Sequence, residues 1–141
     1  MKQISVFLQN KSGKIARITE ALYQAGIDIR ALSIADTTDV GILRMLVSNT
    51  DDAKAVLARE NCIVSVNEVT VVAVPDVPGG LARVLSLLAE AHVDIEYMYS
   101  LIDRGAGDAY MVFRVSDEKK LFEVLKRNNI HTVDAEKLGL R

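Results

Sequence analysis

The sequence has one cysteine, few aromatic residues, no excess of positive charge and no long apolar run. Because Cys62 is alone, an internal disulfide and a thiolate metal cluster are both excluded. The net charge of −2 and the aromatic content of 5% argue against a nucleic-acid partner, since nucleic acid selects clustered basic side chains and stacking platforms. No apolar run approaches a membrane span, and the N-terminus lacks signal-peptide features. We therefore expect a cytoplasmic protein with no membrane partner.

What the sequence does contain is a repeat. Hydrophobic residues make up 50% of the chain and charged residues 26%, as in a compact folded protein. Up to the start of the second strand, corresponding residues of the two copies are separated by a constant offset of 66: Gly13 and Gly79, Arg17 and Arg83, Asp28 and Asp94. By the second helix the offset is 68, as between Asn61 and Asn129. The 141 residues therefore divide into two repeats, residues 1–69 and residues 70–141.

Both copies show the same order of predicted elements, because short β-branched runs alternate with apolar stripes of helical spacing. The first copy predicts strands at residues 4–8, 27–35, 41–48 and from 63 onward, with helices at 15–25 and 50–60. The second predicts strands at 71–74, 93–101, 109–115 and 131–134, with helices at 81–91 and 117–128. This order predicts an α+β protein of two ferredoxin-like βαββαβ units side by side, each an antiparallel sheet with both helices on one face.

The turn before the first helix of the second copy is the most distinctive local pattern. Pro78 restricts one backbone angle, Gly79 and Gly80 free the next two, and a helix follows at once. Several backbone N–H groups should therefore converge at this turn. Such a corner attracts an anion, for instance the carboxylate of a small molecule.

These residues give the chain a resemblance to the ACT domain. In that family an Asp or Asn, then Pro and Gly, open the first helix, and an Asn or Asp followed by Ile starts the second strand. The first copy departs from the pattern, with Ser12 where the family usually has Pro. The second copy carries the motif as Asp76, Val77, Pro78, Gly79, Gly80 and Leu81, followed after the helix by Val93, Asp94 and Ile95.

The resemblance implies a regulatory module that binds a small effector, most often a free amino acid, between two units paired through their second strands. Most family members also carry a catalytic domain, for which this chain has no room. The resemblance therefore implies a protein that is not itself an enzyme and that modulates a metabolic enzyme or its own association. We also expect a homodimer, formed through exposed sheet faces or edges.

Two mixed binding sites are predicted, because within one unit the first helix begins at the end of the sheet opposite to the start of the second strand. A twofold relation would bring the turn of each copy beside the strand start of the other. An amino acid suits both sites, with its carboxylate on the N–H groups and its ammonium on Asp, and neither a metal nor a cofactor is needed. One site combines Asp76, Val77, Pro78, Gly79, Gly80 and Leu81 with Asp28 and Arg30. The other combines Asn10, Lys11, Ser12, Gly13 and Lys14 with Asp94 and Glu96.

Simpler roles for these residues stay open. Gly79 and Gly80 could form only a tight turn, and Asp28 and Asp94 could only cap strand starts through local backbone hydrogen bonds. Two other functions also compete with a regulator. A small enzyme acting on an amino acid or 2-oxo acid is one, although the sequence contains no recognisable catalytic grouping. A purely structural subunit is the other.

Overall fold

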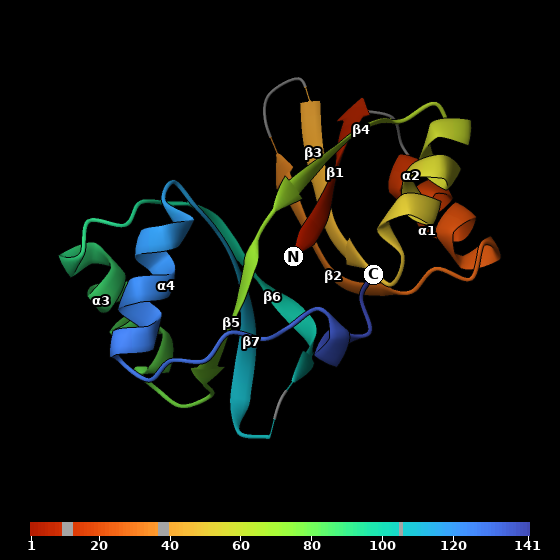
Figure 1. Ribbon diagram of the computed structural model, residues 1–141. Helices are drawn as coiled ribbons and strands as arrows, with labels where there is room; N and C mark the ends of the chain where they lie inside the picture. Colours follow the sequence, from red (N-terminus) through yellow and green to blue (C-terminus); the bar gives the residue numbers. More distant parts are fainter. Residues whose placement is uncertain (10–12, 37–39, 105) are drawn as a thin grey trace. The chain divides into compact units, whose positions relative to one another are not determined.

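Figure 1 shows a computed structural model of the chain, which describes residues 1–9, 13–36, 40–104 and 106–141. Contacts divide it into two compact units. The first unit comprises residues 2–68 together with residues 135–141. The second comprises Met1 and residues 69–134. Each unit is built on one copy of the sequence repeat.

The first unit has the predicted βαββαβ order. Antiparallel pairing places its strands in the order β4–β1–β3–β2. Helices α1 and α2 lie together over one face of this sheet (Figure 1). The elements are β1 (Lys2–Gln9), α1 (Lys14–Gln24), β2 (Ile29–Asp36), β3 (Val40–Val47), α2 (Thr50–Arg59) and β4 (Ile63–Glu68).

The core of the first unit lies between the sheet and these helices. Alternate residues of β1 point into it, because successive side chains of a strand face opposite sides. Ile18 and Leu22 of α1 and Leu57 of α2 are fully buried against them, at the spacing that puts apolar residues on one face of a helix. The apolar periodicity of the sequence thus specifies both the elements and the face that each one buries.

The second unit repeats this order up to its last strand. Its sheet has the order β5–β7–β6, and α3 and α4 lie on one face of it (Figure 1). Val84, Leu88 and Phe113 are among its most deeply buried core residues. The elements are β5 (Thr70–Pro75), α3 (Gly80–Glu90), β6 (Ile95–Arg104), β7 (Asp108–Val115) and α4 (Glu118–Arg127).

The strand predicted at residues 131–134 is reduced to a single bridge between Val72 and Thr132. Two backbone hydrogen bonds hold it, Ala73 N to His131 O at 2.9 Å and Val133 N to Val71 O at 2.8 Å. The chain then leaves this sheet, and residues 135–141 belong to the first unit. The predicted antiparallel α+β fold is otherwise confirmed in both copies.

Residues 135–141 form a closing segment of the first unit. They contain a short 3₁₀ helix, Glu136–Leu138, and the buried side chains of Leu138 and Leu140. Arg141 N donates to Ser48 O at 3.0 Å, and Arg141 O accepts from both Thr50 N and Thr50 Oγ1 at 2.9 Å. The segment therefore joins the first unit where β3 ends and α2 begins.

Within the described ranges, every helix is too short or too polar to cross a membrane.

Candidate functional site

The turn before the first helix of each unit has the same backbone conformation. Gly13 and Gly79 are the N-caps of α1 and α3, and both adopt left-handed angles, with φ of 81° and 87°. Glycine has no side chain that could satisfy the first amide groups of the helix, and neither helix start shows a side-chain cap. In the described residues the amides that follow Gly80 at the start of α3 have no side-chain cap and can receive an anionic group from outside the chain, as can the equivalent amides of α1.

Gly80 follows this N-cap and is required for a steric reason. A Cβ atom there would overlap the carbonyl oxygen of Pro75, whereas one on Gly79 would meet nothing within 4 Å. Two further hydrogen bonds hold the turn: Gly80 N donates to Val77 O at 3.0 Å, and Asp76 N to Gly107 O at 3.0 Å. The helix N-terminus of the second unit is thus held against the end of β5, while Val77 remains 62% exposed beside it.

The two predicted acids lie immediately before β2 and β6, where backbone hydrogen bonds hold them. Ser48 N donates to Asp28 O at 2.9 Å, and Ser116 N to Asp94 O at 3.1 Å. In the first unit Asp28 N also donates to Ser48 Oγ at 2.9 Å. These bonds use the backbone atoms of the two residues and not their carboxylates, and both residues are exposed.

The surroundings of the two carboxylates differ. Arg30 Nη1 lies 3.3 Å from Asp28 Oδ2, so a cation already accompanies that acid. In the described part of the chain the Asp94 carboxylate has no ion pair or side-chain hydrogen bond. Asp94 is therefore the acid better able to receive an ammonium group from outside.

A β-bulge recurs at the same place in both units. Pairing shifts between Ile29 and Ala31 of β2, and between Ile95 and Tyr97 of β6, so Arg30 and Glu96 are the extra residues. Glu96 Oε2 lies 3.3 Å from Arg114 Nε. Bulges redirect side chains and are common beside functional sites. The repeat offset pairs Arg30 with Glu96, but the bulge itself depends on strand register and was not predicted.

The strand register separates the turn from the acid within each unit. In the first unit β1 ends where Gln9 pairs with Val40, whereas β2 begins where Ile29 pairs with Val47. These positions lie at opposite ends of β3, roughly 20 Å apart at the usual rise of a strand. One unit therefore brings Gly13 and Lys14, or Asp76 to Leu81, to one end of its sheet and its acid to the other. Asn10, Lys11 and Ser12 lie outside the described residues.

A cavity recurs in both units beside the start of the first helix, and the sequence interpretation missed it. Each cavity measures about 390 Å³. Residues of the second helix end line it in both, with Asn61 and Asn129 in the left-handed region at φ of 58° and 54°. In the second unit the turn from Val77 to Gly80 forms one wall, and Arg83 and His131 lie among the other lining residues. The recurrence of Arg17 as Arg83, and of Asn61 as Asn129, was the signal available in the sequence.

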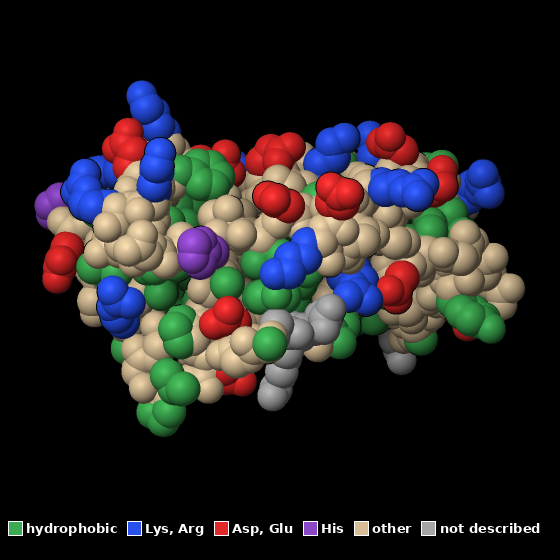
Figure 2. All heavy atoms as spheres, turned by 60° about the horizontal axis from the view of Figure 1, so that its bottom comes forward, with side chains coloured by type: hydrophobic (Ala, Val, Ile, Leu, Met, Phe, Trp, Pro, Cys, Tyr) green, Lys and Arg blue, Asp and Glu red, His purple; other side chains and the backbone are tan. Residues whose placement is uncertain are grey.

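The charge distribution shows no extended field of one sign on the face seen in Figure 2, where basic and acidic side chains are interspersed. Among the residues that the structure describes, no cluster of three or more His, Cys, Asp or Glu side chains could hold a metal ion. The groups that could bind a ligand are therefore backbone amides, charged side chains and the residues that line the small cavities.

Comparisons with known proteins agree with this architecture. A family model described as an ACT domain pair matches residues 1–140. A crystal structure of a protein from Bacteroides thetaiotaomicron is 40% identical, with a TM-score of 0.89 over 98% of this chain and 94% of that one. The ligand-free regulatory subunit of aspartate kinase from Thermus thermophilus is 15% identical, with a TM-score of 0.64 over 89% of this chain and 91% of that one. No curated protein sequence matches the chain.

Proposed function

The chain belongs to the ACT domain pair family, and we propose that it is a regulatory protein that binds a free amino acid and has no catalytic activity of its own. The observation that carries this proposal is the pair of helix starts with a glycine N-cap, whose amide groups have no side-chain cap among the described residues and could receive a carboxylate. The effector would modulate a partner enzyme or the self-association of the chain.

The proposed sites remain the two mixed ones. Neither unit brings its own turn and acid together, so a ligand held by both groups needs one from each repeat. An α-amino acid has charges that suit such a site, since its carboxylate accepts from the helix amides and its ammonium donates to an aspartate. The exposed Asp94 carboxylate supports the site built on Gly13 and Lys14, and Gly79 and Gly80 support the other.

The proposed mode of action rests on an analogy with a regulatory subunit that has the same fold. The regulatory subunit of aspartate kinase from Thermus thermophilus matches the chain over 89% of its length at 15% identity, which establishes a common fold. We propose by analogy that this chain acts on a metabolic enzyme, in the cytoplasm and as a homodimer.

Thermal unfolding tests whether an amino acid binds. One of the standard amino acids, added at ten times its Kd, should raise the Tm by roughly 4 °C, because a ligand that binds only the native state adds its binding free energy to folding. The measurement is a thermal-shift screen of all twenty amino acids at millimolar concentration, with the matching amino alcohols, which lack the carboxylate, as controls. Equal shifts with acid and alcohol, or no shift with any amino acid, would contradict the proposal.

Substitution of the two acids tests which site is occupied. Asp94→Ala should weaken amino-acid binding about tenfold or more, the effect of losing one charge-assisted hydrogen bond, and leave the Tm nearly unchanged because the side chain is exposed. Asp28→Ala should have the same effect if the other site is also filled. Titration calorimetry of both variants gives the affinities, and Glu90→Ala, which removes an exposed carboxylate of α3, is the control. If neither variant binds more weakly than Glu90→Ala, a structural role for both acids is the better account.

A further inference from the structure

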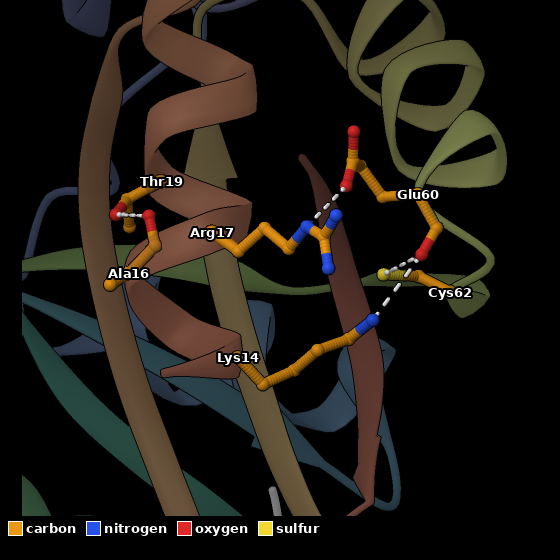
Figure 3. Close-up of polar contacts among 6 residues, drawn as sticks. All are labelled: Lys14, Ala16, Arg17, Thr19, Glu60 and Cys62. Carbon is orange, nitrogen blue, oxygen red and sulfur yellow. Dashed lines mark hydrogen bonds and ion pairs between the residues drawn. The ribbon is translucent and has the colours of Figure 1, made fainter. Parts of the chain in front are cut away.

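The recurrent cavity differs in chemistry between the two units, and the cavity of the first unit is strongly basic. It is lined by Lys14 and Arg17 of α1 and by Arg59 at the end of α2, with Glu60 as the one acidic lining residue. Figure 3 shows Lys14 and Arg17 extending from α1 toward Glu60 and Cys62. Three cations and one carboxylate leave an excess of two positive charges at the rim.

The Glu60 carboxylate neutralises only part of this positive charge. Lys14 Nζ donates to the backbone oxygen of Glu60 at 3.2 Å, and Arg17 Nε lies 3.3 Å from Glu60 Oε2. The Arg17 side chain is nevertheless 75% exposed, so its ion pair with Glu60 is weak and easily exchanged. In the portion of the chain that the structure describes, Arg59 forms no ion pair with any acid.

The second unit places fewer cations in its cavity. Basic groups near a helix C-terminus stabilise it, which would be a sufficient reason for Lys14 and Arg59 to lie beside the end of α2. The second unit also ends its second helix with an arginine, Arg127, but this residue is not part of the cavity lining. Gly80 stands at the position of Lys14, and the acidic Asp108 joins Arg83 in the lining. The excess of positive charge in the cavity lining is thus specific to the first unit.

Part of the remaining wall of the cavity is apolar, beside the polar residues Gln9 and Asn61. Phe7 and Ile63, paired across β1 and β4, are 40% and 70% exposed, and Cys62, which also lines the cavity, packs partly against the core of the first unit. A cavity of about 390 Å³ lies within the size range of small-molecule sites. An occupant with a carbon skeleton would cover this apolar wall, while its charged groups met the three cations.

We propose that this cavity is a second ligand site, distinct from the mixed amino-acid sites, and that it binds a small organic anion with two or more negative charges. Phosphate monoesters and polycarboxylates share this chemistry. The inference does not depend on the amino-acid proposal, because all of its lining groups belong to the first unit. Lys14 is common to both proposals, so Arg17 and Arg59 are the residues that test this one.

Calorimetric titration of the full chain with citrate, and separately with glycerol 3-phosphate, measures the affinity. We expect saturable binding of at least one, weakening as sodium chloride is raised because the site is partly open to solvent. Preference for citrate would identify polycarboxylates as the ligand class, and preference for glycerol 3-phosphate would identify phosphate esters. Arg17→Gln and Arg59→Gln should each weaken binding about tenfold. The matched controls are Arg83→Gln and Arg127→Gln, at the equivalent positions of the second unit, which should change it less than twofold.

Chemical modification of Cys62 tests whether the anion binds in this cavity. Because Cys62 lines the cavity and is the chain's one thiol, alkylation reports on this cavity alone. Saturating citrate or glycerol 3-phosphate should slow its modification by iodoacetamide about fivefold or more, as expected when most sites are occupied. Absence of saturable binding of both anions at millimolar concentration would overturn the proposal. So would binding that leaves Cys62 unprotected, or equal losses in Arg17→Gln and Arg83→Gln.

Discussion

Replacing Gly80 by alanine should destabilise the protein by about 3 kcal/mol, at the upper end of what overpacking costs. The added methyl group would overlap the Pro75 carbonyl oxygen, which is backbone and cannot rotate away. Either β5 or the start of α3 must shift, and Val84, one turn further along α3, is 1% exposed in the core. The unfolding midpoint should fall by roughly 9 °C for a chain of this size.

Gly79→Ala is the control for this variant. It introduces the same methyl group one residue earlier, where nothing lies within 4 Å, and costs only the strain of a left-handed alanine, about 1 kcal/mol. Urea unfolding of both variants gives the comparison. Equal losses of stability in the two variants would mean that backbone conformation, and not the contact with Pro75, makes glycine necessary at this turn. The equivalent position of the first unit carries Lys14, so that helix start has room for a side chain.

Leu138→Ala should lower the free energy of unfolding by about 2–3 kcal/mol, as is usual when truncation of a buried leucine leaves a cavity. Leu138 is 3% exposed and belongs to the closing segment that packs with the first unit. The same change should loosen the hydrogen bond from Thr50 N to Arg141 O, which measures 2.9 Å. Hydrogen exchange at the Thr50 amide should therefore become faster, alongside the fall in the free energy of unfolding measured in urea.

Glu136→Ala is the matched control, since Glu136 lies in the same 3₁₀ helix and is exposed. It should change stability by no more than about 0.5 kcal/mol, as surface substitutions generally do. If Leu138→Ala proved equally mild, or left the exchange of the Thr50 amide unchanged, the closing segment would contribute little to the first unit.

The sequence predicted the fold because the apolar periods of its helices and strands are strong and occur twice. The apolar spacing of a single segment did not by itself decide between helix and strand. Because Asp28 and Asp94 occupy equivalent positions of the two copies, the same secondary structure had to fit both copies. The place of residues 135–141 in the first unit could not be predicted, because no repeated pattern marks them. Residues 135–141 are too short to show a period, and their partners Ser48 and Thr50 lie far away in the sequence. Such a contact can be found only from the assembled structure.

The candidate site could be predicted in part. Gly79 and Gly80 predicted a tight turn in which backbone amides converge before a helix. The left-handed φ of Gly79 agrees with the predicted turn. The bulges that distinguish Arg30 and Glu96 depend on how β2 and β6 align with their neighbours, which no local pattern encodes. The same holds for the basic cavity, whose lining residues come from separate elements of the first unit.

The closing segment has a consequence for biosynthesis. A chain leaves the ribosome from its N-terminus, and domains generally fold in that order. Here Ser48 and Thr50 emerge well before Arg141, the residue that bonds to both of them, because the whole second copy lies between. The first unit therefore acquires its full set of hydrogen bonds only after the second copy of the repeat has been translated.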